Sequence, residues 1–232
     1  MSSRRVNTSS LYSTTQKERE LHGVCSRPTD LLLMIDIRHL ELIKQKHGGY
    51  ASWAVWKDVA KKPKSNMGDM TIFDLDSNPA LLEVLKTNFI MVGLNISRSF
   101  SEPFRNFHDA SATANDFKIR YAFQNTQYSG AYMTDIIKHF AMTDSNQVLE
   151  HLKAHPALKK QNVEIFREEL RDLTSKAPTI LAFGTLAYGI LKENLRRGEE
   201  YSQLIKLTHY SYRISKENYR AKVLSEIDAA SP

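Results

Sequence analysis

The sequence predicts an α/β fold with three α/β/α layers around a four-stranded parallel sheet. Short continuous apolar runs, typical of buried parallel strands, alternate with helix-like segments from residue 78 onward. This alternation favours a parallel sheet with helices on both faces. The expected strands lie near residues 89–94, 131–135, 179–183 and 204–208.

Helix start and stop signals lie between and around these strands. Asp30 is a good N-cap for the first helix, Pro79 suits the first turn of the second, and Ser215 can cap the last. Pro156 is expected to break the long helical segment that contains it. The expected helices cover residues 30–47, 78–86, 114–124, 145–175, 185–195 and 215–228.

The length and composition fit one globular domain. The chain has 232 residues and is 41% hydrophobic, which suits a single large core. Residues 1–29 are polar and rich in Ser and Thr, which predicts a flexible N-terminal arm, with a transit peptide as the alternative. We expect a single domain over residues 30–232, with a helical part at 30–87 and a motif-bearing core at 88–232.

The net charge and the number of cysteines restrict the binding partners and the metal groups that the chain can have. The net charge of +6 and the pI of about 9.3 favour a polyanionic partner such as DNA, although the basic residues are spread along the chain. The single cysteine, Cys25, excludes an internal disulfide, a four-cysteine zinc site and a four-cysteine iron–sulfur cluster. No apolar run approaches the ~20 residues of a membrane helix. We therefore expect an intracellular, cytoplasmic protein without an obligate protein partner.

Three segments place a polar side chain where an expected strand ends. They are Gly-Leu-Asn-Ile-Ser at 93–97, Met-Thr-Asp-Ile-Ile-Lys at 133–138 and Leu-Thr-His-Tyr-Ser at 207–211. Ligands bind at the carboxyl ends of the strands in open parallel sheets. The amide of Asn95, the carboxyl of Asp135 and the imidazole of His209 should therefore converge on one cleft.

These segments resemble, in order, motifs of the uracil-DNA glycosylase superfamily. Segment 93–97 is similar to the Gly-Ile-Asn-Pro-Gly or Gly-Met-Asn-Pro-Gly motif of the mismatch-specific and single-strand-selective branches. Residues 104–107 (Phe-Arg-Asn-Phe) and 115–117 (Asn-Asp-Phe) resemble the aromatic loop and the helix that follows it. The remaining matches are 134–138 to a Thr-Asn-Val-Val-Lys segment, 178–184 to a Pro-x-Ile-x-x-x-Gly turn, and 209–211 to the His-Pro-Ser motif. The resemblance covers residues 88–222 and leaves 1–87 outside.

The resemblance implies two catalytic residues. Asn95 matches the residue that holds the attacking water, and an amide can orient water without deprotonating it. This suffices when the sugar is already cationic in the transition state. His209 matches the residue that stabilises the departing base anion, a role that a neutral imidazole can fill. The resemblance implies no metal and no cofactor.

The resemblance also implies DNA contacts. Phe107 matches the ring that stacks on the flipped base, and Ser211 matches the residue that binds a backbone phosphate. Tyr212 and Arg213 follow the final motif, where the family inserts a wedge into the base stack. DNA is therefore the expected partner.

The departures from the family motifs concern substrate choice. Ile96 and Tyr210 replace motif prolines without removing a reactive group. Asp135 stands where the family has Asn, and an ionised carboxylate can only accept hydrogen bonds, so it suits the amino group of cytosine rather than O4 of uracil. Ser97 stands where strict uracil enzymes have a bulky Tyr, which leaves space at C5 of the base. Together these residues predict a cytosine with a 5-substituent as the substrate.

The resulting hypothesis is a monofunctional DNA glycosylase for a 5-modified cytosine-type base, with defence against foreign DNA as its expected role. The alternatives are a conventional uracil or mismatch glycosylase and a non-catalytic nucleic-acid binder with the same fold.

Individual residues have simpler interpretations. Asn95 could cap a turn, His209 could be a structural histidine, Asp135 could cap the next helix and Phe107 could be a core aromatic. The pair His151 and His155 has metal-ligand spacing, but the sequence offers no third ligand, and we interpret the pair as a surface coincidence.

Overall fold

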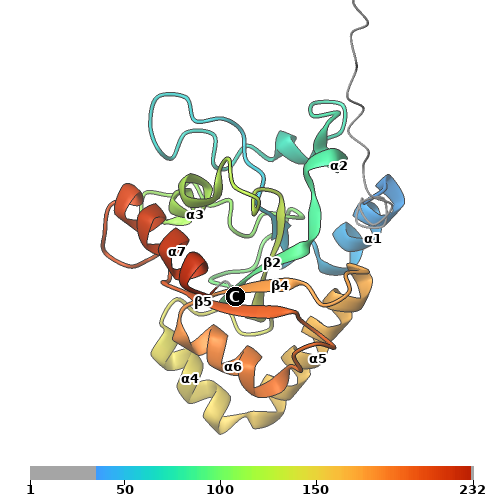
Figure 1. The fold of residues 1–232 in the computed structure, drawn as a ribbon, viewed down its shortest axis with the longest axis vertical. Helices are drawn as coiled ribbons and strands as arrows, with labels where there is room; N and C mark the ends of the chain where they lie inside the picture. Colours follow the sequence, from blue (N-terminus) through green and yellow to red (C-terminus); the bar gives the residue numbers. More distant parts are fainter. Residues whose placement is uncertain (1–34, 231–232) are drawn as a thin grey trace, which may run out of the picture.

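The structure is a computed structural model that describes residues 35–230. The predicted N-terminal arm (1–29), with Cys25, lies outside these residues, as does the predicted cap Asp30. Within the described range, the elements form a sheet with helices on both faces, as the sequence predicts (Figure 1).

The sheet has five strands rather than the four that were predicted. The four predicted strands are present, and they pair in parallel. The additional strand β1 pairs antiparallel with β3 at the edge of the sheet. It is only two residues long, which is too short to show the period-two pattern that identifies a strand in a sequence. In spatial order the strands are β1 (Ser52–Trp53), β3 (Ala131–Ile137), β2 (Lys86–Asn95), β4 (Thr179–Phe183) and β5 (Gln203–Leu207).

Most helices lie where the sequence predicts them, with two differences. Within the described residues the first helix begins at Ile37, where the side chain of Asp36 caps it by accepting a hydrogen bond from the His39 N–H; the predicted start at residue 30 lies outside them. The second covers a single turn rather than residues 78–86, since β2 already begins at Lys86. The α-helices are α1 (Ile37–His47), α2 (Leu81–Val84), α3 (Asp116–Phe123), α4 (Ser145–Ala154), α5 (Pro156–Asp172), α6 (Thr185–Asn194) and α7 (Lys216–Ala230), and a 3-10 helix, η2, covers Met70–Phe73.

Successive strand residues point to opposite faces of the sheet and divide the core into two clusters. Ile90 and Val92 of β2 pack with α1, α4, α5 and α6, whereas Met91 lies in the cluster with α3 and α7. In Figure 1, α4, α5 and α6 lie below the sheet and α3 and α7 lie above it. By the same alternation, Gly93 and Asn95 lie on the face of α3 and α7.

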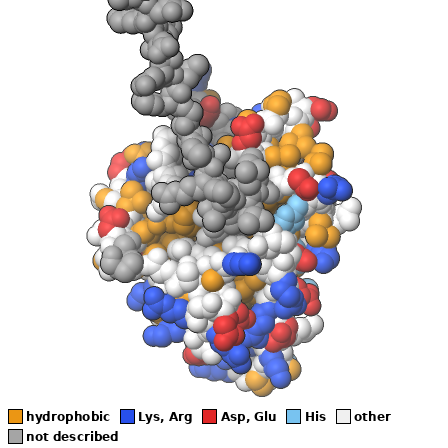
Figure 2. All heavy atoms as spheres, turned by 45° about the vertical axis from the view of Figure 1, so that its right-hand side comes forward, with side chains coloured by type: hydrophobic (Ala, Val, Ile, Leu, Met, Phe, Trp, Pro, Cys, Tyr) orange, Lys and Arg blue, Asp and Glu red, His pale blue; other side chains and the backbone are white. Residues whose placement is uncertain are grey.

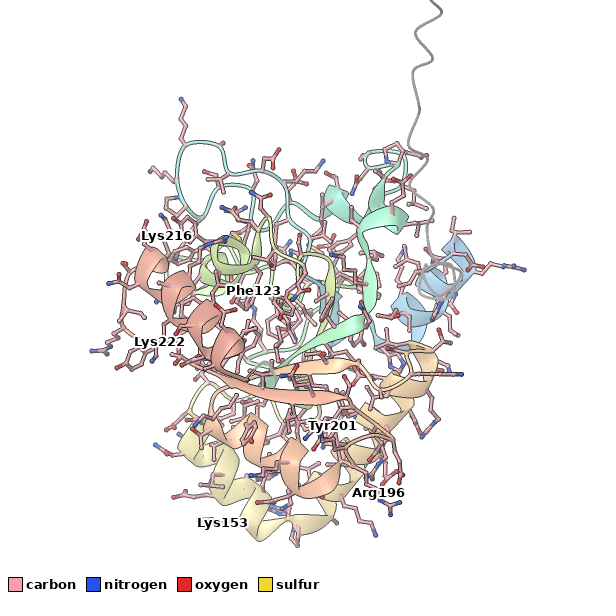
Figure 3. All side chains as sticks on the ribbon, viewed as in Figure 1. Phe123, Lys153, Arg196, Tyr201, Lys216 and Lys222 are labelled. Atoms are coloured by element: carbon pink, nitrogen blue, oxygen red, sulfur yellow. The ribbon has the colours of Figure 1, made fainter. Side chains whose placement is uncertain are left out.

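The layer formed by α3 and α7 has an aromatic interior and a charged exterior. Figure 3 shows Phe123 in the interior, and Lys216 and Lys222 on the outside of α7. Phe123 is fully buried and its ring contacts those of Tyr128 and Phe183. In residues 35–230, no helix combines the length and apolar character needed to cross a membrane.

Candidate active site

A cavity of about 630 Å³ opens where the four parallel strands end. Its position agrees with the general rule for ligand sites in open parallel sheets. Asn95 ends β2, Phe183 ends β4, and His209 lies two residues beyond β5. Six residues that the sequence analysis selected line this one cavity: Asn95, Ser97, Phe107, Asp135, His209 and Ser211.

The side chain of Asn95 has a defined orientation. Its Nδ2 donates to the carbonyl oxygens of Met142 at 2.6 Å, Ile96 at 2.9 Å and Phe140 at 3.3 Å. Its Oδ1 therefore points away from these carbonyls, and within residues 35–230 no group donates a hydrogen bond to it. The amide thus holds the loop at 140–142, as a structural Asn would, and keeps a free acceptor at the cavity wall.

Asp135 lies inside β3, so the alternative interpretation, that it caps the next helix, is wrong. That helix, α4, is capped by Asp144, whose side chain accepts from the Asn146 N–H. Asp135 is 3% exposed and pairs in register with Gly93 on β2. A Cβ atom at Gly93 would lie 2.1 Å from Oδ1 of Asp135. Glycine is therefore needed at position 93 to leave room for the carboxyl group.

Within residues 35–230, the carboxyl group of Asp135 accepts one hydrogen bond and forms no ion pair. Its Oδ2 accepts from Nδ2 of Asn106 at 2.8 Å. The nearby ammonium group of Lys138 instead bonds the backbone carbonyl of Asp135 and pairs with Glu169 at 2.9 Å. Burial raises the pKa of Asp135 to about 7, although Asn106 and Lys138 act in the opposite direction. The neutral and ionised forms are therefore both populated near neutral pH, whereas the sequence analysis assumed an ionised carboxylate.

His209 is held as a neutral imidazole. Its Nδ1 lies 3.2 Å from the backbone N–H of Ser211, which donates to it, and 2.8 Å from Oγ of the same residue. Since Nδ1 accepts, the ring proton lies on Nε2. Burial lowers the pKa of His209 to about 4, so the ring is uncharged at neutral pH. Nε2–H is then available as a donor.

Aromatic rings form one wall of the cavity. Tyr210 stacks on His209 with ring centroids 4.2 Å apart and meets Phe183 and Phe107 edge-on at 5.4 and 6.4 Å. Phe107 is 3% exposed and belongs to the core cluster of α3 and α7, yet it also lines the cavity. Phe107 is therefore a core residue, and this position is compatible with the predicted stacking of its ring on a base.

The sequence analysis missed two polar residues of the site. Asn106 joins the site together, since its Nδ2 bonds Asp135 and its Oδ1 accepts from the Phe107 N–H. Asp116, at the start of α3, is a second buried carboxyl in the cavity wall, and burial raises its pKa to about 6. A polar Asn between the aromatic residues of segment 104–107 was the signal that could have identified Asn106.

The remaining predicted residues lie at the exposed edge. Ser97 and Ser211 are exposed lining residues. Tyr212 and Arg213 are exposed and lie outside the cavity lining, and the backbone carbonyl of Tyr212 accepts from Lys118. Their predicted insertion into DNA stays a prediction.

Neither the surface charges nor the histidine pair indicates a particular function. On the face in Figure 2, Lys and Arg side chains gather on the lower part, interspersed with Asp and Glu. The rings of His151 and His155 contact each other at 4.3 Å, and within residues 35–230 no group of three or more His, Cys, Asp or Glu side chains could hold a metal ion.

Comparison of the chain with models of protein families, with curated proteins and with solved structures found no match. The functional assignment therefore depends on the cavity and on the motif resemblance.

Proposed function

We propose that this protein is a monofunctional DNA glycosylase that hydrolyses the N-glycosidic bond of a flipped, 5-modified cytosine-type base and leaves an abasic site. The main supporting observation is the convergence on one cavity of Asn95 at the end of β2, Asp135 in the last part of β3 and His209 just beyond β5. A binder that only holds DNA has no need for an amide with a free acceptor and a neutral imidazole in one pocket.

In this proposal, Asn95 and His209 share the chemical step. Oδ1 of Asn95 accepts a hydrogen bond from water and holds it beside the sugar carbon, C1′. Nε2–H of His209 donates to the O2 oxygen of the base, where negative charge develops as the C1′–N1 bond breaks. The fixed amide and the neutral ring support these roles, because groups oriented before reaction stabilise a transition state without reorganising.

The surrounding residues would bind the nucleotide. A base within a duplex must leave the stack to reach a pocket of this kind. Phe107 would stack on the base and Ser211 would contact a backbone phosphate, with Tyr212 and Arg213 filling the gap in the DNA. DNA as partner is part of this proposal.

Asp135 and Ser97 define the proposed substrate. An acceptor oxygen on Asp135 suits the exocyclic amino group of cytosine, and the small Ser97 leaves space for a 5-substituent. Hydrolysis of such bases would suit defence against DNA with modified cytosines. A conventional uracil or mismatch glycosylase is the second candidate, because the neutral form of Asp135 could donate to a carbonyl at position 4 of the base.

The test is incubation of the protein with DNAs bearing cytosine, 5-hydroxymethylcytosine, glucosylated 5-hydroxymethylcytosine, uracil or thymine. Alkaline treatment then cleaves any abasic site. We expect cleavage at a 5-substituted cytosine. Absence of cleavage in every DNA, single-stranded or duplex, contradicts the proposal, whereas cleavage only at uracil contradicts the substrate assignment.

A further inference from the structure

We infer that Asp135, besides reading the base, is the proton donor that allows a cytosine-type base to leave. This inference rests on the proposed function and adds a chemical step to it. Cytosine is a poorer leaving group than uracil, because its anion has one carbonyl rather than two to spread the charge. A proton delivered to the ring nitrogen N3 removes that disadvantage, since the base then departs uncharged.

The geometry around the carboxyl group favours this role. Oδ2 of Asp135 accepts from Nδ2 of Asn106, so the acidic proton of the neutral form belongs on Oδ1. Oδ1 lies over Gly93, and Cζ of Phe107 lies 3.5 Å from the position that a Cβ atom of residue 93 would take. Asp135 and Phe107 both line the cavity. In residues 35–230 no group forms a hydrogen bond with Oδ1. The proton would thus face the place where Phe107 holds the base.

Burial and two neighbouring acidic groups also favour a neutral carboxyl at Asp135. The charge of Lys138, just beyond β3, acts in the opposite direction and lowers the pKa, but its ammonium group pairs with Glu169 of α5 rather than with Asp135. Asp116 of α3 repels a negative charge on Asp135 and raises its pKa, as Glu169 also does. The hydrogen bond from Asn106 lowers the pKa.

The next nearest groups do not neutralise Asp135. Arg98 pairs with Asp109 at 3.1 Å, and the ring of His209 is neutral. The phenol of Tyr210 has a raised pKa, to which burial, Asp116 and Asp135 contribute, so it stays protonated. The carboxyl of Asp135 therefore takes a proton near neutral pH more readily than an exposed aspartate does.

Departure of the base couples one bond cleavage to one proton transfer. The C1′–N1 bond breaks and its electron pair stays with the base, while the proton of Oδ1 moves to N3. The base leaves neutral, Asp135 becomes a carboxylate, and the water held by Asn95 adds to C1′ and loses a proton to solvent. The carboxylate then regains its proton from solvent before the next turnover.

The first test is the single-turnover rate of base release between about pH 5 and about pH 9, for cytosine-type and uracil DNA. For the cytosine-type base we expect a rate that falls about tenfold per pH unit above the pKa of Asp135. Asp135→Asn, which keeps the shape but cannot give up a proton, should lower this rate ~100-fold or more and remove the pH dependence. Its rate on uracil should fall far less, because the uracil anion can leave without an acid.

Two further variants identify the titrating group. Asp116→Asn removes a neighbouring negative charge, so the midpoint of the profile should move to lower pH. Asn106→Ala removes a hydrogen bond to the carboxylate, so the midpoint should move to higher pH. A carboxyl carbon-13 titration of the free protein, with Asp135 assigned from the Asp135→Asn spectrum, should give the same midpoint as the wild-type rate profile.

The outcomes distinguish a failure of the proton-donor role from a failure of the glycosylase proposal. Base release with a flat profile, or a profile that disappears in Asp116→Asn rather than in Asp135→Asn, overturns the proton-donor role and leaves the glycosylase proposal intact. An Asp135 carboxyl that stays ionised throughout the titration also overturns the proton-donor role. No release from any DNA overturns both.

Discussion

Asp135 and Glu169 are both buried carboxyl groups, yet they lie in opposite environments. Glu169 is fully buried, pairs with Lys138 at 2.9 Å and accepts hydrogen bonds from Tyr132 and Thr134. Among the residues that the structure describes, the carboxyl group of Asp135 accepts one hydrogen bond, from Asn106, and forms no ion pair. Thr134 and Asp135 are neighbours in β3, so the two faces of one strand serve two different purposes. A carboxyl that pairs with a buried cation and accepts two hydrogen bonds stabilises the fold, whereas one that is partly partnered beside a cavity is available for chemistry.

Replacement of Glu169 should have the largest effect on stability. Glu169→Gln leaves the ammonium group of Lys138 buried without its counter-ion, so we expect a loss of ~3–5 kcal/mol in the free energy of unfolding. Urea denaturation measures this loss. The exposed Glu199, which pairs with Arg196 on the surface, is the control, and Glu199→Gln should change stability by less than about 1 kcal/mol. Equal losses in both variants would contradict the structural role of Glu169.

Replacement of the proposed catalytic pair should abolish the proposed activity without unfolding the protein. Asn95→Ala removes the acceptor proposed to position water, and His209→Ala removes the donor proposed for O2, so each should slow single-turnover base release ~100-fold or more. DNA binding, measured by fluorescence anisotropy, should change little.

Exposed residues of the same types are the matched controls. Asn146→Ala and His155→Ala should both retain wild-type rates. Unchanged rates in Asn95→Ala and His209→Ala would remove the glycosylase proposal.

Asp135→Asn should stabilise the protein at alkaline pH, in contrast to Glu169→Gln. The folded-state pKa of Asp135 is raised to about 7 from its usual value of 3.8, so the folded protein binds the proton more tightly than the unfolded chain. Stability is therefore lost as pH rises between these values, and the full penalty remains above them. We expect Asp135→Asn to add ~1–3 kcal/mol at about pH 8 and little near pH 4, as measured by urea denaturation. A loss of stability at about pH 8 would mean that the carboxylate is needed for folding.

Enlarging Ser97 should have the smallest effect and should act on one substrate class. Ser97→Tyr fills the space proposed for a 5-substituent, so release of a 5-substituted cytosine should fall ~10-fold or more relative to release of unsubstituted bases. The ratio of the two rates for wild type and variant is the measurement. A parallel fall for both substrates would show that Ser97 does not face C5 of the base.

Local patterns in the sequence predicted much of the fold. The apolar runs identified all four parallel strands, and Pro156 marked the boundary between α4 and α5. The two-residue β1 could not be predicted, since its existence depends on pairing with β3, whose sequence lies about eighty residues further along the chain. The predicted cap of the first helix, Asp30, lies outside the described residues, and Asp36 caps α1 within them.

The candidate site, like the fold, was predicted in part from the sequence and decided in part by the tertiary structure. A polar residue at the end of each strand predicted that Asn95, Asp135 and His209 would meet, because parallel strands end at one edge of a sheet. Tertiary structure alone decided the protonation state of Asp135. Its carboxyl accepts a hydrogen bond from Asn106, and Lys138, which could have paired with it, pairs with Glu169 instead. The nearby charge of Asp116 raises the pKa of Asp135. These groups come from distant parts of the chain, and a pKa depends on burial and on neighbouring charges rather than on residue type.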